Sequence, residues 1–119
     1  MEPVKPLKWS EDLGRASRDH VIDTGPKGLV QHESHDGTSV KERLKKYGKI
    51  VTCYGENLSF HCENALDVIL QLVVDDGVPN RGHRENIFNP DFRCVGIYSG
   101  AHKDFDTMTT LDYAAAFVK

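Results

Sequence analysis

Two histidines and two acidic residues, in four separate segments of this 119-residue chain, are the residues best suited to chemistry. They are His32, Glu56, Asp75 and His83. Neutral imidazoles and carboxylates suit a borderline divalent cation such as zinc, and the same groups can act as general acids and bases. These residues predict a metal site or an acid–base site if the fold brings the four segments together.

Each of these residues also has an ordinary structural explanation. His32 stands before an Asp36-Gly37 turn, where it could bond to the backbone, and no paired His or Cys supports it as a ligand. Glu56 could accept hydrogen bonds from turn amides. Asp75 competes with Asp76, and both could simply end a helix in solvent. The spacing of these residues alone therefore does not decide between a functional and a structural role.

His83 lies between basic neighbours, near the expected start of a short helix. Their positive charge and the helix dipole disfavour an imidazolium, which leaves the neutral form that binds a cation. The same field repels a cation, so Glu56 and Asp75 would be needed to offset it. His20, on the apolar side of the first expected helix, is interpreted instead as a satisfied histidine of the core or its edge.

Four motifs in a fixed order give these residues a context. They are His-x-Ser-x-Asp-Gly (32–37), Gly-Glu-Asn-Leu (55–58), Gly-His-Arg (82–84) and Asn-Ile-Phe-Asn-Pro (86–90). With them the chain resembles, from about Leu7 to Phe117, the CAP superfamily of cysteine-rich secretory, antigen 5 and pathogenesis-related proteins, also called SCP-like domains. The resemblance implies that His32, Glu56 and His83 face one cavity, with Asp75 in place of the family's second acid, which is commonly glutamate.

The length and composition fit one globular domain over residues 1–119, with residues 1–6 extended. The net charge of −3 provides no basic stripe for nucleic acid, and no apolar run is long enough to cross a bilayer. The polar, proline-bearing start of the chain is not a signal peptide. Cys53 and Cys62 could close a loop, or they and Cys94 could remain free buried thiols.

The pattern of apolar residues and caps predicts the elements that would position the site. Ser10 caps a first helix that Gly25-Pro26 ends, and Ser39 with Glu42 forms a capping box for a short second helix. The strongest helix is expected at 65–74, a further helical turn at 80–88, and strands at 50–54, 92–99 and 107–117. Strands in which hydrophobic and polar residues do not alternate are usually covered on both faces of the sheet. The predicted fold is therefore α+β, a three-layer α–β–α sandwich around a small antiparallel sheet.

The resemblance implies an extracellular, non-enzymatic binding module whose cavity of two histidines and two acids can take zinc. Its partner would be an unknown protein, a lipid or a sterol. The alternative is a metal-dependent hydrolase that uses the same cavity, and a third interpretation is a purely structural or interaction fragment. Family members usually begin with a further helix that this chain lacks, so we expect an exposed apolar strip and self-association, for example as a homodimer.

Overall fold

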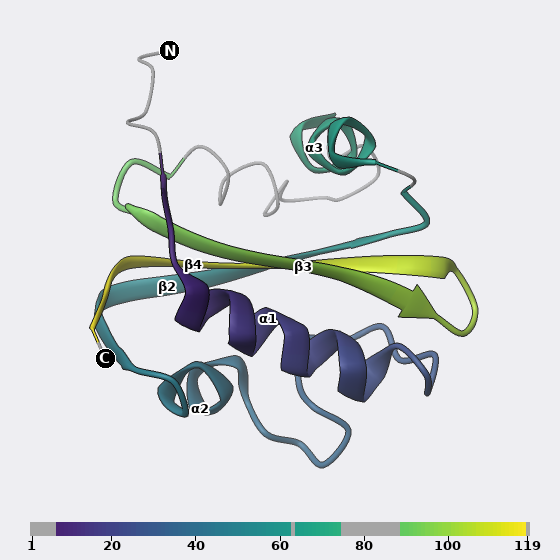
Figure 1. Cartoon of the computed structure of the whole chain (residues 1–119), viewed down its shortest axis with the longest axis horizontal. Helices are drawn as coiled ribbons and strands as arrows, with labels where there is room; N and C mark the ends of the chain where they lie inside the picture. Colours follow the sequence, from purple (N-terminus) through teal and green to yellow (C-terminus); the bar gives the residue numbers. More distant parts are fainter. Residues whose placement is uncertain (1–6, 63, 75–88, 119) are drawn as a thin grey trace.

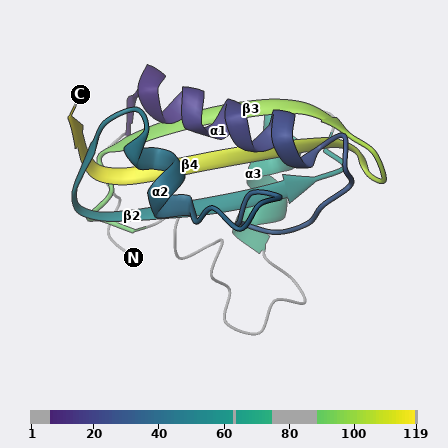
Figure 2. The same ribbon diagram turned by 90° about the horizontal axis from the view of Figure 1, so that it is seen from below.

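A four-stranded sheet, formed by the described strands, lies between helices on both of its faces. The structure is a computed structural model that describes residues 7–62, 64–74 and 89–118. In chain order the elements are β1 (Lys8–Trp9), α1 (Glu11–Thr24), α2 (Val40–Lys45), β2 (Lys49–Phe60), α3 (Ala65–Val74), β3 (Cys94–His102) and β4 (Asp106–Val118). Helices α1 and α2 cover one face and α3 covers the other (Figures 1 and 2). The predicted α–β–α sandwich is confirmed.

The strand order is β1-β3-β4-β2, and β4 pairs antiparallel with both of its neighbours. The sheet is not wholly antiparallel, because β1 runs parallel to β3. Two backbone bonds of 2.8 Å tie this short strand down, from Lys8 N to Arg93 O and from Ser10 N to Val95 O. The chain thus forms an edge strand at Lys8–Trp9, whereas the predicted extended segment of residues 1–6 lies outside the described part.

Local sequence signals place the helices correctly. Ser10 Oγ accepts a hydrogen bond of 3.1 Å from Leu13 N at the start of α1. Ser39 Oγ accepts one of 3.2 Å from Glu42 N at the start of α2. Helix α3 has the predicted bounds of 65–74, whereas the predicted helical turn at 80–88 falls outside the described residues. None of the described helices is long and apolar enough to cross a membrane.

Strand β2 is much longer than the predicted 50–54. It continues through Gly55-Glu56-Asn57, which was expected to lie at a strand end, and pairs with β4 as far as Phe60. The turn-like residues stay extended because β4 offers a partner for each of them, so tertiary pairing overrides the local preference. As a result, Glu56 lies within the sheet rather than in a turn.

Helix α1 approaches β3 so closely that only glycine fits between them. A Cβ on Gly96 would lie 2.0 Å from Gly14 N and 2.2 Å from Leu13 C, both backbone atoms of α1. This contact sets the spacing of the layer that contains Leu13, Ala16, Leu44 and Ala114. On the other face, Val68 of α3 packs with residues of β3 and β4, while Leu66, Ile69 and Leu70 remain exposed.

Two glycine substitutions test this packing in opposite directions. Gly96→Ala must push α1 away from the sheet, and we expect a loss of about 3 kcal/mol in unfolding free energy because overpacking costs this much in rigid cores. Gly14→Ala, whose Cβ would meet only Trp9 at an ordinary 3.5 Å, should instead stabilise the helix by up to about 1 kcal/mol. Urea denaturation measures both. Equal stability of the two variants would contradict the close approach.

Candidate functional site

The predicted site residues that the structure describes lie next to each other. His32 sits in the irregular segment between α1 and α2, and Glu56 is in β2. His32 Nδ1 is 2.9 Å from Glu56 Oε1. The imidazole is 47% exposed and the carboxylate is 2% exposed, so the histidine covers a buried acid. Asp75 and His83, with the competing Asp76, fall outside the described residues.

A buried arginine holds the other oxygen of Glu56. Arg43 Nη2 is 2.5 Å from Glu56 Oε2, and Nη1 is 3.1 Å from Asp112 Oδ2. The guanidinium also donates to two backbone carbonyls, those of Ala16 (3.1 Å) and His32 (3.4 Å). Arg43 is 2% exposed. One side chain of α2 therefore connects α1, the His32 segment and the neighbouring strands β2 and β4.

Asp112 brings a second carboxyl group into the same buried space. It is the cross-strand partner of Glu56 in the β2–β4 pairing, with its side chain fully buried. Ser17 Oγ of α1 lies 2.8 Å from Asp112 Oδ2 and 3.0 Å from Gly96 O. Two carboxyl groups therefore share the cluster with a single arginine.

The two acids respond to this environment in opposite ways. Burial raises the pKa of Asp112 well above its ordinary value, and the charge of Glu56 raises it further. Burial also acts to raise the pKa of Glu56, but hydrogen bonds from Asp112 and His32 and the charge of Arg43 outweigh it and lower the pKa to about 2. Of the two carboxyl groups beside Arg43, Glu56 therefore loses its proton first, and Asp112 keeps its proton to higher pH.

Glu56 also determines which ring nitrogen of His32 carries the proton. A carboxylate only accepts hydrogen bonds, so the proton between them is on His32 Nδ1. This bond raises the pKa of His32, against the opposing effect of burial. Nε2 makes no hydrogen bond to any described residue and carries no proton in the neutral form, which makes it the ring atom suited to a cation.

His20 supports the loop that carries His32. It is fully buried in α1, and its Nε2 lies 2.9 Å from the carbonyl oxygen of Gln31. Burial lowers the pKa of His20, so the ring is neutral at pH 7. The predicted core position is confirmed, but the ring is only half satisfied, because Nδ1 finds no partner among the described residues.

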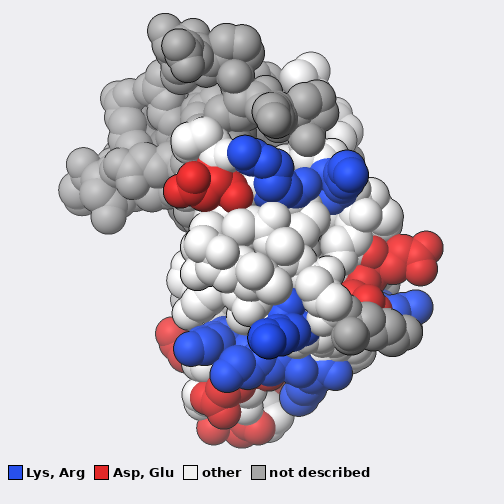
Figure 3. Space-filling model, turned by 90° about the vertical axis from the view of Figure 1, so that its left-hand side faces the viewer, with Lys and Arg blue, Asp and Glu red and all other residues white. Residues whose placement is uncertain are grey.

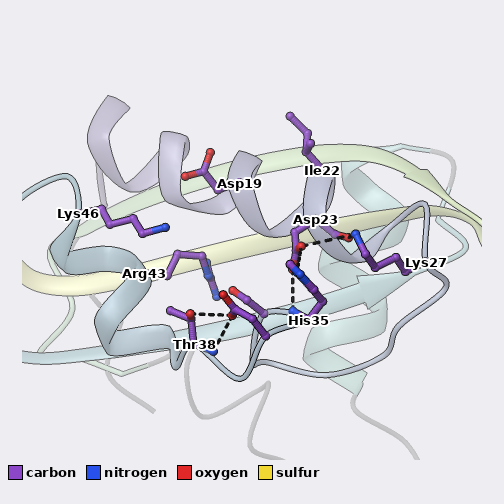
Figure 4. A pocket seen from close by; sticks show the side chains of 10 residues that line it. Asp19, Ile22, Asp23, Lys27, His35, Thr38, Arg43 and Lys46 are labelled. Carbon is purple, nitrogen blue, oxygen red and sulfur yellow. Dashed lines mark hydrogen bonds and ion pairs between the residues drawn. The ribbon is translucent and has the colours of Figure 1, made fainter.

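A polar pocket of about 400 Å³ opens beside this cluster and shares Arg43 with it. Figure 4 shows the pocket between α1, the loop after His32 and α2. His35 there bonds to Asp23 through both its backbone N–H, at 2.8 Å, and its ring. The remaining carboxylates are engaged as well, Asp36 by Thr38 and Asp19 by Tyr47.

The predictions for the thiols and for the metal site have different outcomes. The described thiols, Cys53, Cys62 and Cys94, are all free and half-buried, so no disulfide closes the loop around Glu56. In the part of the chain that the structure describes, no group of three or more His, Cys, Asp or Glu side chains is arranged to hold a metal ion. A complete metal site would need ligands from outside the described ranges.

Sequence reasoning missed Arg43, Asp112 and Ser17, which organise the site. The sequence did contain a signal for Arg43 and for Asp112. Arg43 falls three residues after Val40, on the apolar side of α2, and Asp112 interrupts the otherwise uncharged stretch 107–118. A charge on an apolar stripe is almost never fully buried unless it is paired, so such positions can be searched for partners.

Comparison with known proteins places this chain in a family. The chain matches the family model of CAP, the cysteine-rich secretory protein family, over residues 1–113. The chain belongs to the CAP family. It is similar to the uncharacterized protein YkwD of Bacillus subtilis (strain 168), with 29% identity over 94 residues, which are 79% of this chain and 35% of that protein. The chain thus spans about a third of the length of this relative.

Two solved structures share the fold. One is an outer surface protein from Borrelia burgdorferi, with a TM-score of 0.76, 20% identity and coverage of 93% of this chain and 78% of that one. The other is an extracellular protein containing a SCP domain from Bacillus anthracis str. Ames, with a TM-score of 0.74, 20% identity and coverage of 93% and 34%. At this identity the likeness concerns the fold.

The opposite pKa shifts of Glu56 and Asp112 can be tested with matched amide substitutions. Glu56→Gln leaves the buried guanidinium without its ionised partner, and we expect a loss of about 3 kcal/mol of unfolding free energy at pH 7. Asp112→Asn replaces the carboxyl group whose pKa is raised with a neutral amide of similar shape, and should cost less than about 1 kcal/mol. Denaturant titration compares the two variants.

The pH dependence provides the control for this prediction. Because burial raises the pKa of Asp112 in the folded protein, wild type loses stability as the pH rises from the ordinary value through the raised one. Asp112→Asn removes this loss, so its stability relative to wild type should improve as the pH rises above the ordinary pKa of an aspartic acid. A larger penalty for Asp112→Asn than for Glu56→Gln would contradict the assigned charges.

Proposed function

We propose that this chain is a non-enzymatic CAP binding module whose cavity holds a divalent cation such as zinc. The observation that carries the proposal is the 2.9 Å contact between His32 Nδ1 and the buried Glu56. A carboxylate that holds one ring nitrogen orients the other toward a metal and raises the basicity of the ligand. His83 and Asp75 are the further ligands that the proposal needs.

In this proposal Glu56 orients His32 rather than acting mainly as a ligand itself. Both of its oxygens are already engaged, one by His32 and one by Arg43. The donor set around the cation would then be mainly imidazole nitrogen with one carboxylate, which suits zinc or copper. When bound, the cation would supply a Lewis-acidic centre to which a polar group of a partner can attach.

The surroundings of Glu56 favour binding over hydrolysis. A general base works best with a pKa near the operating pH, and Glu56 has a pKa of about 2. Asp112 cannot replace it, because that carboxyl group is fully buried beneath the cluster. Two histidines and an acid around a cation are nevertheless the pattern of a hydrolytic zinc site in principle, so a metal-dependent hydrolase remains the alternative that needs a test.

An extracellular or surface location is part of the proposal. It rests on the two structural relatives, one described as an outer surface protein and the other as an extracellular protein. A second site for a partner would be an apolar pocket of about 250 Å³ between α3 and the sheet, lined by Val68, Ile69, Ile97 and Leu111 among others. It is smaller than most sites that enclose a drug-sized ligand, so it suits an acyl tail better than a sterol.

Zinc titration tests the metal site. We expect wild type to bind one zinc ion and both His32→Ala and His83→Ala to lose at least about tenfold in affinity, because each variant removes a ligand. His61→Ala, which changes an exposed histidine, serves as the control.

Binding should weaken below about pH 6, where histidine takes up protons. For His32 the weakening should begin at higher pH, because Glu56 raises its pKa. Equal zinc affinity in all variants would show that the metal binds at another site, for example at the thiols.

The hydrolase alternative makes a separate prediction. We expect no peptidase, esterase or phosphatase activity above background with zinc present, since Glu56 is too weak a base. Assays on generic substrates, with a chelator as control, measure this. Metal-dependent turnover that disappears in Glu56→Gln, in protein shown by circular dichroism to be folded, would establish the hydrolase and refute the non-enzymatic proposal.

A further inference from the structure

A basic groove runs between α2 and the start of β2, on the side of the molecule seen in Figure 3. Lys and Arg side chains gather there over α2 and the first residues of β2. The groove has a volume of about 580 Å³. Its lining consists of Lys41, Lys45, Gly48, Lys49, Ile50, Thr52 and Tyr54.

The lysines of this groove are not engaged in ion pairs with described residues, although Glu42 lies on the same helix. No Asp or Glu side chain is among the described residues that line it. None of Lys41, Lys45 and Lys49 forms an ion pair with a described carboxylate. Lys41 and Lys45 are four residues apart on one helix, a like-charge spacing that destabilises an isolated helix. Three lysines that line one groove, in a chain of net charge −3, form a local site for anions.

The shape of the groove decides which anion fits. Strand β2 is at the edge of the sheet, but its pairing is irregular between Val51 and Tyr54, and Thr52 has a φ of 71°. Such a bulge protects an edge against the addition of another strand. An acidic peptide is therefore poorly placed to pair with this backbone. A bilayer surface is flat and would not enter a groove, whereas a single extended polymer chain can.

The uncharged lining residues favour a sugar polymer. Tyr54 is 41% exposed and offers an aromatic face on which the apolar side of a sugar ring can lie. Thr52 is exposed and supplies a hydroxyl group that both donates and accepts hydrogen bonds. Lysines provide point charges rather than the bidentate forks that select individual phosphates. We infer that this groove binds an acidic polysaccharide, with carboxylate or sulfate groups on the three lysines and a ring on Tyr54.

This inference is independent of the metal site and agrees with the proposed extracellular location. The groove shares no lining residue with the His32–Glu56 pair. Zinc binding and saccharide binding can therefore be measured separately on the same protein. A protein that binds no zinc would leave this inference intact.

The test compares two variants with the same change in net charge. The groove variant carries Lys41→Gln, Lys45→Gln and Lys49→Gln. The control carries Lys8→Gln, Lys27→Gln and Lys103→Gln, which are exposed lysines outside the groove. All proteins are titrated with a heparin-derived dodecasaccharide, and with oligogalacturonate and neutral dextran for comparison, by fluorescence anisotropy at several salt concentrations.

We expect wild type to bind both acidic saccharides but not dextran. The groove variant should bind the dodecasaccharide about tenfold more weakly at low salt, and the slope of log Kd against log salt should fall by about one for each lysine removed. The control should stay within about twofold of wild type. Tyr54→Ala should weaken binding without changing the slope, because it removes stacking and not charge.

Several results would overturn the inference. One is an equal loss of affinity in the groove and control variants, which would indicate a general charge effect. A second is tighter binding to oligothymidylate of matched charge than to either saccharide, which would make the groove a nucleic-acid site. A third is binding to phosphatidylserine vesicles in preference to saccharide. Absence of saccharide binding by wild type would also refute it.

Discussion

The buried ion pair between Arg43 and Glu56 is the interaction on which the rest of the site depends. A guanidinium inside a protein is strongly unfavourable unless acceptors surround it. Here the acceptors come from α1, the His32 segment, β2 and β4. Each of these segments must therefore be in place for the two terminal nitrogens of Arg43 to find their acceptors, which couples the layer of α1 and α2 to the sheet. The same contacts leave Glu56 ionised and aimed at His32.

Most of the fold could be predicted from the sequence because its signals are local. The caps at Ser10 and Ser39 lie within three residues of the amides that they satisfy, and the apolar run of α3 gives its bounds directly. The strands were harder to predict. The length of β2 and the parallel pairing of β1 depend on partners far along the chain, and no local pattern contains that information.

The site was predictable only in part, for the same reason. The ordered motifs indicated that His32 and Glu56 belong together, and the structure places them in contact. Nothing local predicts that Asp112 lies beside Glu56, because this depends on the register between β2 and β4. The role of Arg43 follows from that register, since its two nitrogens reach both carboxyl groups. Charge on an apolar stripe marks such residues, but only the three-dimensional pairing identifies their partners.

The basic residues of α2 show how burial determines whether arginine or lysine suits a position. Arg43 points inward to oxygens that are fixed by the sheet and by backbone carbonyls, and a planar fork with several donors can satisfy them together. A lysine there would bring one strongly hydrated ammonium group and fewer donors. Lys41 and Lys45 face solvent, where a flexible stem and a hydrated charge lose little. A six-residue helix thus carries an arginine that binds fixed acceptors inside the protein and lysines whose side chains lie on its surface. Because isolated helices of this length are not stable, α2 depends on the burial of Arg43 and Leu44 and on the cap at Ser39 to hold both sets in position.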